Sequence, residues 1–371
     1  MELDLQKMLS LRSQFSTTSS DAARDHEEGY RKIGAGACGA IFAVDGEPAA
    51  FKLAKADQES LWNDFCMHKL IAENFRKWKS RKWTYADVKV PECYYFVPKD
   101  EHLYFDKNPS LVEAAKDTCN LPTSILVSER ILPLPKPTRD LLIEKYCPPQ
   151  VKQTALNDVA NKDCLVRPYL GSLKGRQGRF FSLRNFKMHL EQMAELQLDI
   201  KELAGKMATA MALMHWAAKT DARDIEFVLG SSSLKAQVKM SAEHYLNLPG
   251  PVYTGPPSRV LGDFFICITD LWLLDFNQVR QISMDEAGVA MAIEAIKLND
   301  PYIPKPLQGS EIEKQAWDEF VKQYLVSAHD ILREEPNYME LSDLPAMFIN
   351  GVIEVERKKQ EKRDCVAEDK E

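Results

Sequence analysis

The stretch YRKIGAGACGAIFAVDGEPAAFKLAK, residues 30–55, decides the fold. Apolar and polar residues alternate through much of it, and Asp45-Gly46 and Glu47-Pro48 mark turns. This alternation predicts strands, because successive side chains of a strand point to opposite faces. The glycines ahead of the turns predict a tight hairpin whose backbone can approach another molecule closely. We therefore expect a glycine-rich hairpin followed by a strand that carries Lys52.

The three glycines of the hairpin, Gly34, Gly36 and Gly39, match the pattern G-x-G-x-x-G. A dinucleotide-binding fold would need a strand before this pattern and a helix after it, whereas here a strand follows. Lys52 then comes thirteen residues after the last glycine, in AFKLA. This context resembles the eukaryotic protein-kinase fold, in which a glycine hairpin covers phosphates and a strand lysine pairs with them and with a helix carboxylate.

The kinase resemblance implies a partner for Lys52 on the helix expected over residues 56–78. Glu59 and Asp64 are the two candidates on that helix. The alternative is that Lys52 is an ordinary strand lysine whose ammonium reaches solvent.

Two later stretches follow the kinase motifs in the same order. In DARDIEFVLG, residues 221–230, Asp221 lies five residues before Glu226, which opens an apolar run. The kinase catalytic loop has the same spacing between an aspartate and an asparagine. LLDFN, residues 273–277, resembles the strand that enters the D-F-G metal site, with Asp275 as its aspartate. Glu226 and Asn277 depart from the kinase residues, which puts phosphotransfer in doubt.

The whole pattern predicts an α+β protein with a protein-kinase-like two-lobed fold. Residues 1–28 are expected to form a tail or a short helix. A small β-rich N-lobe with the Gly-rich hairpin spans 29–127, with an irregular insertion near 98–122. A larger, mainly helical C-lobe spans 128–371, with an insertion near 231–262 and helices near 284–298, 311–332 and 343–363.

Composition excludes several classes of protein. Of 371 residues, 45% are hydrophobic and 28% are charged, which is ordinary for a globular protein. No apolar run is long enough to cross a bilayer and no signal-peptide pattern is present, so we expect a cytoplasmic protein with no membrane partner. The eight cysteines lack the spacing of zinc sites, and we predict no metal. The net charge of -7 argues against indiscriminate nucleic-acid coating, and no DNA partner is expected.

Acidic residues gather near the kinase-like motifs: Asp221, Asp224, Glu226 and Asp275. Carboxylates that lie close together raise one another's pKa unless a cation neutralises them. Without a magnesium nucleotide, a guanidinium or an ammonium group is the natural counterion. The alternative is that Asp224 and Glu226 form internal salt bridges with Arg223 or Arg280.

Two basic stretches interleaved with aromatic residues predict contact with RNA backbone and bases. They are HKLIAENFRKWKSRKW, residues 68–83, and LKGRQGRFFSLRNFK, residues 173–187. The alternative is a pair of solvated loops. The candidate tRNA-binding residues are Arg76, Lys77, Lys79, Arg81, Lys82, Lys174, Arg176, Arg179 and Arg184.

Four stretches, SLRNF, MALMHW, DARDIEFVLG and LWLLDFNQV, together resemble a fungal family of arginine-containing cyclodipeptide synthases that was long labelled zinc-finger-like. The resemblance spans about residues 30–335. It implies an aminoacyltransferase that joins arginine from arginyl-tRNA to a second aminoacyl group and forms a cyclic dipeptide, a 2,5-diketopiperazine of secondary metabolism. It implies charged tRNAs as partners and no cofactor, because each aminoacyl ester is already activated.

On this resemblance, Asp221, Asp224 and Glu226 recognise the arginyl side chain or its α-amine, and one of them acts as a general base. His215 is a candidate proton carrier, although MHW is equally typical of a packed core histidine. The residues expected to hold the tRNA 3′ end in place of ATP are Lys52, Gly34, Gly36, Gly39, Asp275 and Asn277. Two alternatives remain: a kinase-like ATP-dependent phosphotransferase and a pseudokinase-type interaction protein.

Overall fold

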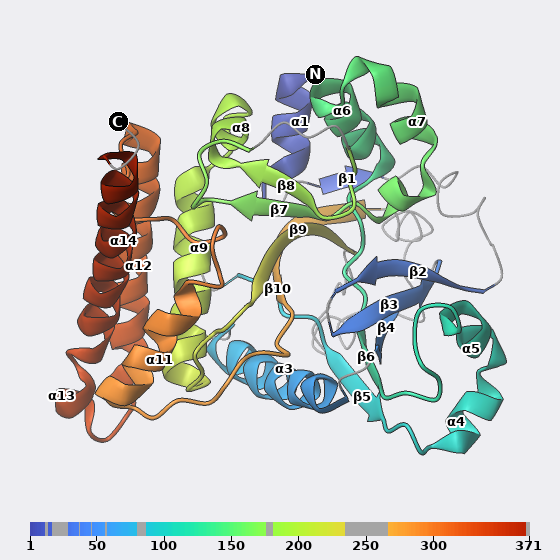
Figure 1. The fold of residues 1–371 in the computed structure, drawn as a ribbon, viewed down its shortest axis with the longest axis horizontal. Coiled ribbons are helices and arrows are strands. Elements are labelled where there is room, and N and C mark those ends of the chain that lie inside the picture. The colour runs from blue at the N-terminus through green and yellow to red at the C-terminus, as the bar shows by residue number, and fades with distance from the viewer. Residues whose placement is uncertain are drawn as a thin grey trace, which may run out of the picture.

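Two five-stranded sheets and the helices around them form the computed structural model of this chain (Figure 1). The structure describes residues 1–11, 14–16, 29–36, 38–45, 47–55, 58–79, 87–175, 181–233 and 266–368. The architecture is α+β, as the sequence predicts. No helix in these described ranges combines the length and the apolarity that crossing a membrane requires.

The first sheet contains the glycine-rich hairpin. Its order is β2 (Tyr30–Ala35), β3 (Gly39–Val44), β4 (Ala49–Ala54), β6 (Ile125–Glu129) and β5 (Cys93–Val97), and every neighbouring pair is antiparallel. Phe42, Leu53 and Val127 fill the core beneath it. Helix α3 (Gln58–Lys79) follows β4, close to the range that the sequence predicts.

The insertion near 98–122 is helical, whereas the sequence analysis expected it to be irregular. It contains α4 (His102–Lys107) and α5 (Pro109–Ala115). Leu111 and Ala115 of α5 are buried in the core of the first sheet. Proline is favourable in the first turn of a helix, so Pro109 marks a helix start rather than an irregular loop.

Four strands of the second sheet lie in residues 128–371, which were expected to be mainly helical, and the fifth, β1 (Gln14–Ser16), lies near the N-terminus. The order of this sheet is β1, β10 (Ile266–Leu274), β9 (Glu226–Ser233), β7 (Val166–Tyr169) and β8 (Phe186–His189). Strands β7 and β8 are parallel, and the other pairs are antiparallel. Residues near 186 form β8, and α8 (Leu190–Glu195) and α9 (Ile200–Ala212) follow it.

The C-terminal helices occur where the sequence places them. They are α11 (Glu286–Ile296), α12 (Glu311–Leu332) and α14 (Leu344–Glu368), with the short α13 (Tyr338–Leu341) between the last two. A capping box between Ser310 and Glu313 begins α12. Figure 1 shows α9, α12 and α14 together on the side of the molecule away from the first sheet. Helices α6 (Lys136–Tyr146) and α7 (Lys152–Asn157) lie near β1 and β8.

The N-terminal residues, expected as a tail or a short helix, include α1 (Glu2–Leu9). Leu5 and Leu9 of this helix are buried in the large core. The insertion expected near 231–262 lies outside the described residues, apart from 231–233 at the end of β9.

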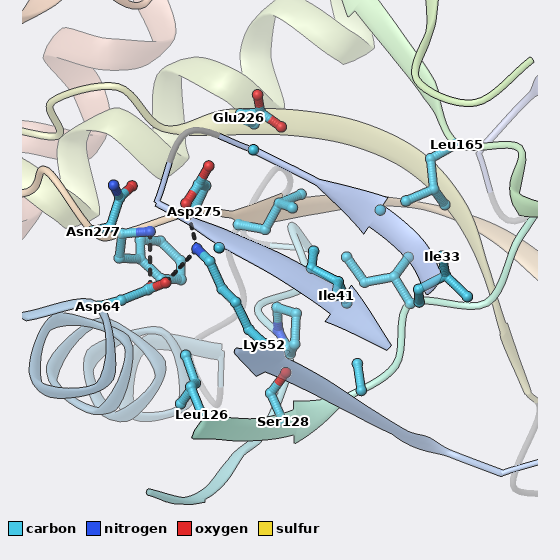
Figure 2. Close-up of a pocket in the computed structure, with 18 of the residues that line it drawn as sticks. Ile33, Ile41, Lys52, Asp64, Leu126, Ser128, Leu165, Glu226, Asp275 and Asn277 are labelled. Carbon is cyan, nitrogen blue, oxygen red and sulfur yellow. Dashed lines mark hydrogen bonds and ion pairs between the residues drawn. The ribbon is translucent and has the colours of Figure 1, made fainter. Parts of the chain in front are cut away.

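The pairing of β9 with β10 positions the acidic motifs. Leu274, the last residue of β10, lies opposite Glu226, the first residue of β9. Asp275, which follows β10, and Asp224, which precedes β9, therefore lie at the same end of this strand pair. We call this end the acidic edge. This edge faces the glycine-rich hairpin of the first sheet (Figure 2).

Candidate functional site

A cleft of ≈ 330 Å³ lies between the first sheet and the edge of the β9–β10 pair. Both glycine-rich and acidic motifs line it, together with β6 and the residues that follow β6. Its volume falls in the range typical of small-molecule sites. The cleft therefore brings together the two parts of the sequence that carried the functional prediction.

Lys52 lies between two carboxylates in this cleft. Its Nζ is 2.6 Å from Asp64 Oδ2 and 2.8 Å from Asp275 Oδ1 (Figure 2). Burial alone would lower the pKa of Lys52, but Asp64 and Asp275 raise it well above the ordinary lysine value. Of the two partners considered from sequence, the structure selects Asp64, and Glu59 is exposed. Lys52 is therefore a permanent cation that two acids already neutralise.

Helix α3 also fixes the segment after β10 by further hydrogen bonds. Asn63 Nδ2 donates to the carbonyls of Asn277 at 2.9 Å and Val279 at 3.0 Å. Asp64 Oδ1 accepts from the backbone N–H of Phe276 at 3.1 Å. Sequence reasoning missed the role of Asn63, although its place beside Asp64 on a predicted helix was a usable signal.

Two aspartates at the acidic edge have left-handed backbone. Asp275 has φ 68° and Asp224 has φ 57°, a conformation that Asp and Asn adopt more readily than most residues. Each residue adjoins the end of a strand, so the bend turns its carboxyl group out of the sheet. Gln278 Nε2 also donates a hydrogen bond to Asp224 Oδ2. Both aspartates line the cleft.

Glu226 is the carboxyl group with the most perturbed acidity at this edge. Its Oε2 lies 2.6 Å from Arg167 Nη2, from strand β7. Burial raises the pKa of Glu226 to about 7, since it outweighs the opposing effect of Arg167, and Asp275 and Asp224 add to the rise. Burial and Asp275 also raise the pKa of Asp224. Glu226 therefore exchanges a proton near neutral pH, as a general base requires.

We define the acidic end of the cleft by four carboxyl groups and two cations. The carboxyl groups are Asp64, Asp224, Glu226 and Asp275, and the cations are Lys52 and Arg167. The acids outnumber the cations. Within the described ranges, no group of three or more His, Cys, Asp or Glu is arranged to hold a metal ion.

The glycine hairpin covers the acidic end closely. A Cβ atom added at Gly39 would meet Leu53 O at 2.9 Å and Lys52 Cγ at 3.2 Å. Gly34 and Gly36 line the cleft as well. Asn277 Nδ2 donates to Cys38 Sγ at 2.7 Å, so the turn of the hairpin contacts the segment after β10. Gly39 thus lets Lys52 pack directly beneath the hairpin.

Two predicted catalytic residues do not lie in the cleft. Asp221 is fully buried, and it accepts from Arg280 Nε at 2.6 Å and from the backbone N–H groups of Arg280 and Arg223. His215 is also fully buried, and its Nδ1 lies 2.8 Å from Tyr324 Oη. Burial lowers the pKa of His215 to about 3. Asp221 instead anchors its loop, and His215 is the packed core residue that the alternative interpretation described.

Among the predicted tRNA-binding residues that the structure describes, three form ion pairs with acids. Arg76 pairs with Glu92 at 2.8 Å, Lys174 pairs with Glu191 at 3.1 Å, and Trp78 is buried. Arg184 is half-buried against Asp163. Lys77 and Lys79 are exposed. The remaining candidates, Arg81, Lys82, Arg176 and Arg179, lie outside the described residues.

Arg167 was missed by sequence reasoning altogether. It lies in the buried strand VRPY, where an arginine costs desolvation unless an acid partner is near. That isolated charge was the available signal. Its partner Glu226 is distant in the sequence, so the pairing of the two residues could not be predicted.

A family model described as "Zinc finger protein" matches residues 271–336, which is less than a fifth of the chain. The matched family is not one of cyclodipeptide synthases, so the family resemblance inferred from the sequence is wrong. No curated protein matches the chain. The matched segment begins in β10 and includes Asp275 and Asn277 of the cleft.

Proposed function

We propose that the chain has a kinase-like, two-lobed fold, in which the first sheet and α3 form the smaller lobe. Three observations support this proposal. A glycine hairpin leads into a strand lysine, the next helix supplies a carboxylate to that lysine, and an aspartate after β10 supplies a second. Protein kinases position phosphates with the same set of parts.

We propose that the reaction in this cleft is aminoacyl transfer between charged tRNAs that forms an arginine-containing cyclic dipeptide. The observation that carries this proposal is the excess of carboxyl groups at the acidic end. Lys52 is already held by Asp64 and Asp275, so a triphosphate placed there without magnesium meets more negative than positive charge. A substrate that brings its own cation is attracted to the same place.

Aminoacyl-tRNA brings such a cation in its α-ammonium group. Glu226, with its pKa raised to about 7, is matched to accept a proton from that ammonium. The freed amine attacks the ester carbonyl of the second aminoacyl-tRNA, so a C–N bond forms and the C–O bond to the tRNA breaks. The released 3′ oxygen takes a proton. A second attack of the same kind closes the ring and releases the other tRNA.

Arginine supplies a second cation of suitable geometry. A planar guanidinium binds carboxylates through paired hydrogen bonds, and Asp224 and Asp275 both line the acidic end. Burial, and then the charge of Asp275, raise the pKa of Asp224. We therefore assign the arginyl side chain to these two aspartates. Because this reaction consumes charged tRNA, we also propose a cytoplasmic location.

A reconstituted reaction tests the proposal. The purified protein is incubated with tRNA, ATP, amino acids and the matching synthetases, and arginine-containing cyclic dipeptides are sought by mass spectrometry. We expect a product that requires arginyl-tRNA and is lost in Asp224→Asn and Glu226→Gln. The absence of a product with every partner amino acid would refute the proposal.

A kinase-like phosphotransferase is the second candidate, and the Lys52–Asp64–Asp275 arrangement favours it. It predicts magnesium-dependent ATP consumption that is lost in Lys52→Met and Asp275→Asn. A pseudokinase-type interaction protein would give neither ATP consumption nor a cyclic dipeptide. The same preparations therefore distinguish all three functions.

A further inference from the structure

The end of the cleft away from Asp275 carries a second cluster of charged side chains, in which the cations outnumber the acids. We call it the arginine cluster: Arg31, Arg130, Arg184, Asp45 and Asp163. Ile33 and Leu165 mark this end in Figure 2, and Arg31 and Asp163 each lie two residues earlier in the chain. Arg130 and Asp163 themselves line the cleft.

The cluster is held together by short ion pairs. Arg31 binds Asp163 through both terminal nitrogens at 2.7 Å and binds Asp45 through Nε and Nη2 at 2.9 Å. Arg184 Nη2 lies 2.9 Å from Asp163 Oδ2, and Arg130 Nη2 lies 3.3 Å from Asp45 Oδ1. Three guanidinium groups thus converge on two carboxylates.

This cluster retains both unpaired charge and unused donors. Arg130 is only 7% exposed, yet its Nε has no hydrogen-bond partner in the described residues, and neither has the buried Nε of Arg184. Glu129 also lines the cleft, but its carboxylate accepts from the backbone N–H of Glu92, the residue before strand β5. An anion would satisfy donors that the chain itself leaves unused.

We propose that the arginine cluster binds the phosphate on the 5′ side of the adenosine that occupies the cleft. This inference rests on the proposed function, because it uses the terminal adenosine of tRNA as the occupant. The aminoacylated 3′ side then faces the acidic end, and the 5′ phosphate faces the arginines. The two ends of the cleft therefore match the two charges of an aminoacyl-tRNA terminus in one orientation.

The same chemistry has two sources, the phosphodiester of a polynucleotide and the phosphate of a free nucleotide. Binding of three probes to the full chain separates them: adenosine, adenosine 5′-monophosphate, and the dinucleotide cytidylyl-3′,5′-adenosine. We expect the dinucleotide to bind about tenfold more tightly than adenosine, as one charge-assisted contact provides. If adenosine 5′-monophosphate binds more tightly than the dinucleotide, the cluster is a site for free nucleotides, and the proposed orientation of tRNA is overturned.

Arg184→Gln is the test variant, because Arg184 is the most exposed of the three arginines. Its control is Arg333→Gln, which removes an exposed arginine paired with Asp330 far along the chain. The preference for the dinucleotide should fall to within about twofold in Arg184→Gln and persist in Arg333→Gln. Arg184→Lys keeps the charge without the planar fork, and we expect it to restore part of the preference. Thermal unfolding of each variant checks that it is folded.

The outcomes separate this inference from the proposed function. Equal binding of adenosine and the dinucleotide to the unchanged protein would refute the phosphate site, while cyclic dipeptide formation would still support the reaction. If Arg184→Gln still prefers the dinucleotide to adenosine, the phosphate site is also refuted. If the protein prefers the dinucleotide but forms no cyclic dipeptide, the phosphate site is supported and the proposed reaction is rejected. Binding of none of the three probes would overturn the inference.

Discussion

Arg280 Nε lies 2.6 Å from Asp221 Oδ2, and this pairing keeps Asp221 out of the cleft. The backbone N–H of Asp221 also donates to the carbonyl of Arg280 at 2.9 Å, and the backbone N–H of Arg280 donates to Asp221 Oδ1 at 2.9 Å. Asp224, only three residues further along the chain, lines the cleft. The two aspartates of DARDIEFVLG therefore have different tasks: Asp221 holds the loop, and Asp224 faces the substrate.

Asp221→Asn should lower stability, because it weakens the bonds that a fully buried carboxylate accepts from the half-exposed Arg280 and from two backbone N–H groups. We expect a loss of about 1–3 kcal/mol in the free energy of unfolding. Asp224→Asn should leave stability within about 0.5 kcal/mol while reducing activity. Urea unfolding of both variants checks this difference. Equal stability of Asp221→Asn and the unchanged protein would argue against the anchoring role.

Lys52→Met should both destabilise the protein and abolish activity. Without the ammonium group, Asp64 and Asp275 face each other across the cleft without their shared counterion. We expect a cost of about 3 kcal/mol, typical for removing one partner of a buried ion pair. Lys136→Met is the matched control, since Lys136 and Asp140 form an exposed pair whose loss should cost under about 1 kcal/mol. Similar losses in both variants would contradict the central position of Lys52.

Activity should rise with pH through about 7, because Glu226 must lose its proton to act as a base. Stability should change in the opposite direction. The pKa of Glu226 is raised from an ordinary value of 4.5, so its contribution to stability is complete below about 4.5 and is lost as pH rises through about 7.

Glu226→Gln should remove both pH dependences and lower the rate by about 10²- to 10⁴-fold. Initial rates and unfolding midpoints measured from pH 5 to about 9 check this. A variant that retains the rise in rate would show that another group is the base.

Gly39→Ala should impair binding in the cleft, whereas Gly36→Ala should not. The new methyl group at 39 meets backbone and the Lys52 side chain, and overpacking of this kind costs about 1–3 kcal/mol. No described atom lies within 4 Å of the position that a Cβ would take at Gly36. Adenosine binding and thermal unfolding of the pair provide the check. Equal effects of the two substitutions would contradict the close packing of Lys52 beneath the hairpin.

Local patterns predicted the parts of the site that depend on nearby residues. The glycine hairpin, the strand of Lys52 and helix α3 follow from alternation and periodicity within about fifty residues. The choice between Glu59 and Asp64 stayed open, because both residues lie on the same helix and only its packing decides which one faces Lys52. The helical insertion after β5 was missed, although a proline such as Pro109 is favourable in the first turn of a helix.

Long-range pairs could not be predicted in this way. Glu226 and Arg167 are 59 residues apart, and so are Asp221 and Arg280. A single sequence gives the types of these residues but not their pairing, so Asp221 was assigned to catalysis and Arg167 was overlooked. The arginine cluster depends on an Arg31–Asp163 contact across 132 residues, and it emerged only from the folded chain.

The most direct test of the central claim uses purified arginyl-tRNA and a second purified charged tRNA, mixed with the protein in the absence of ATP. Mass spectrometry then follows the cyclic dipeptide over time. We predict an arginine-containing product from the unchanged protein and its loss in Glu226→Gln. If the charged tRNAs stay intact with every second amino acid, while the protein consumes ATP with magnesium in a parallel reaction, the aminoacyl-transfer account is contradicted.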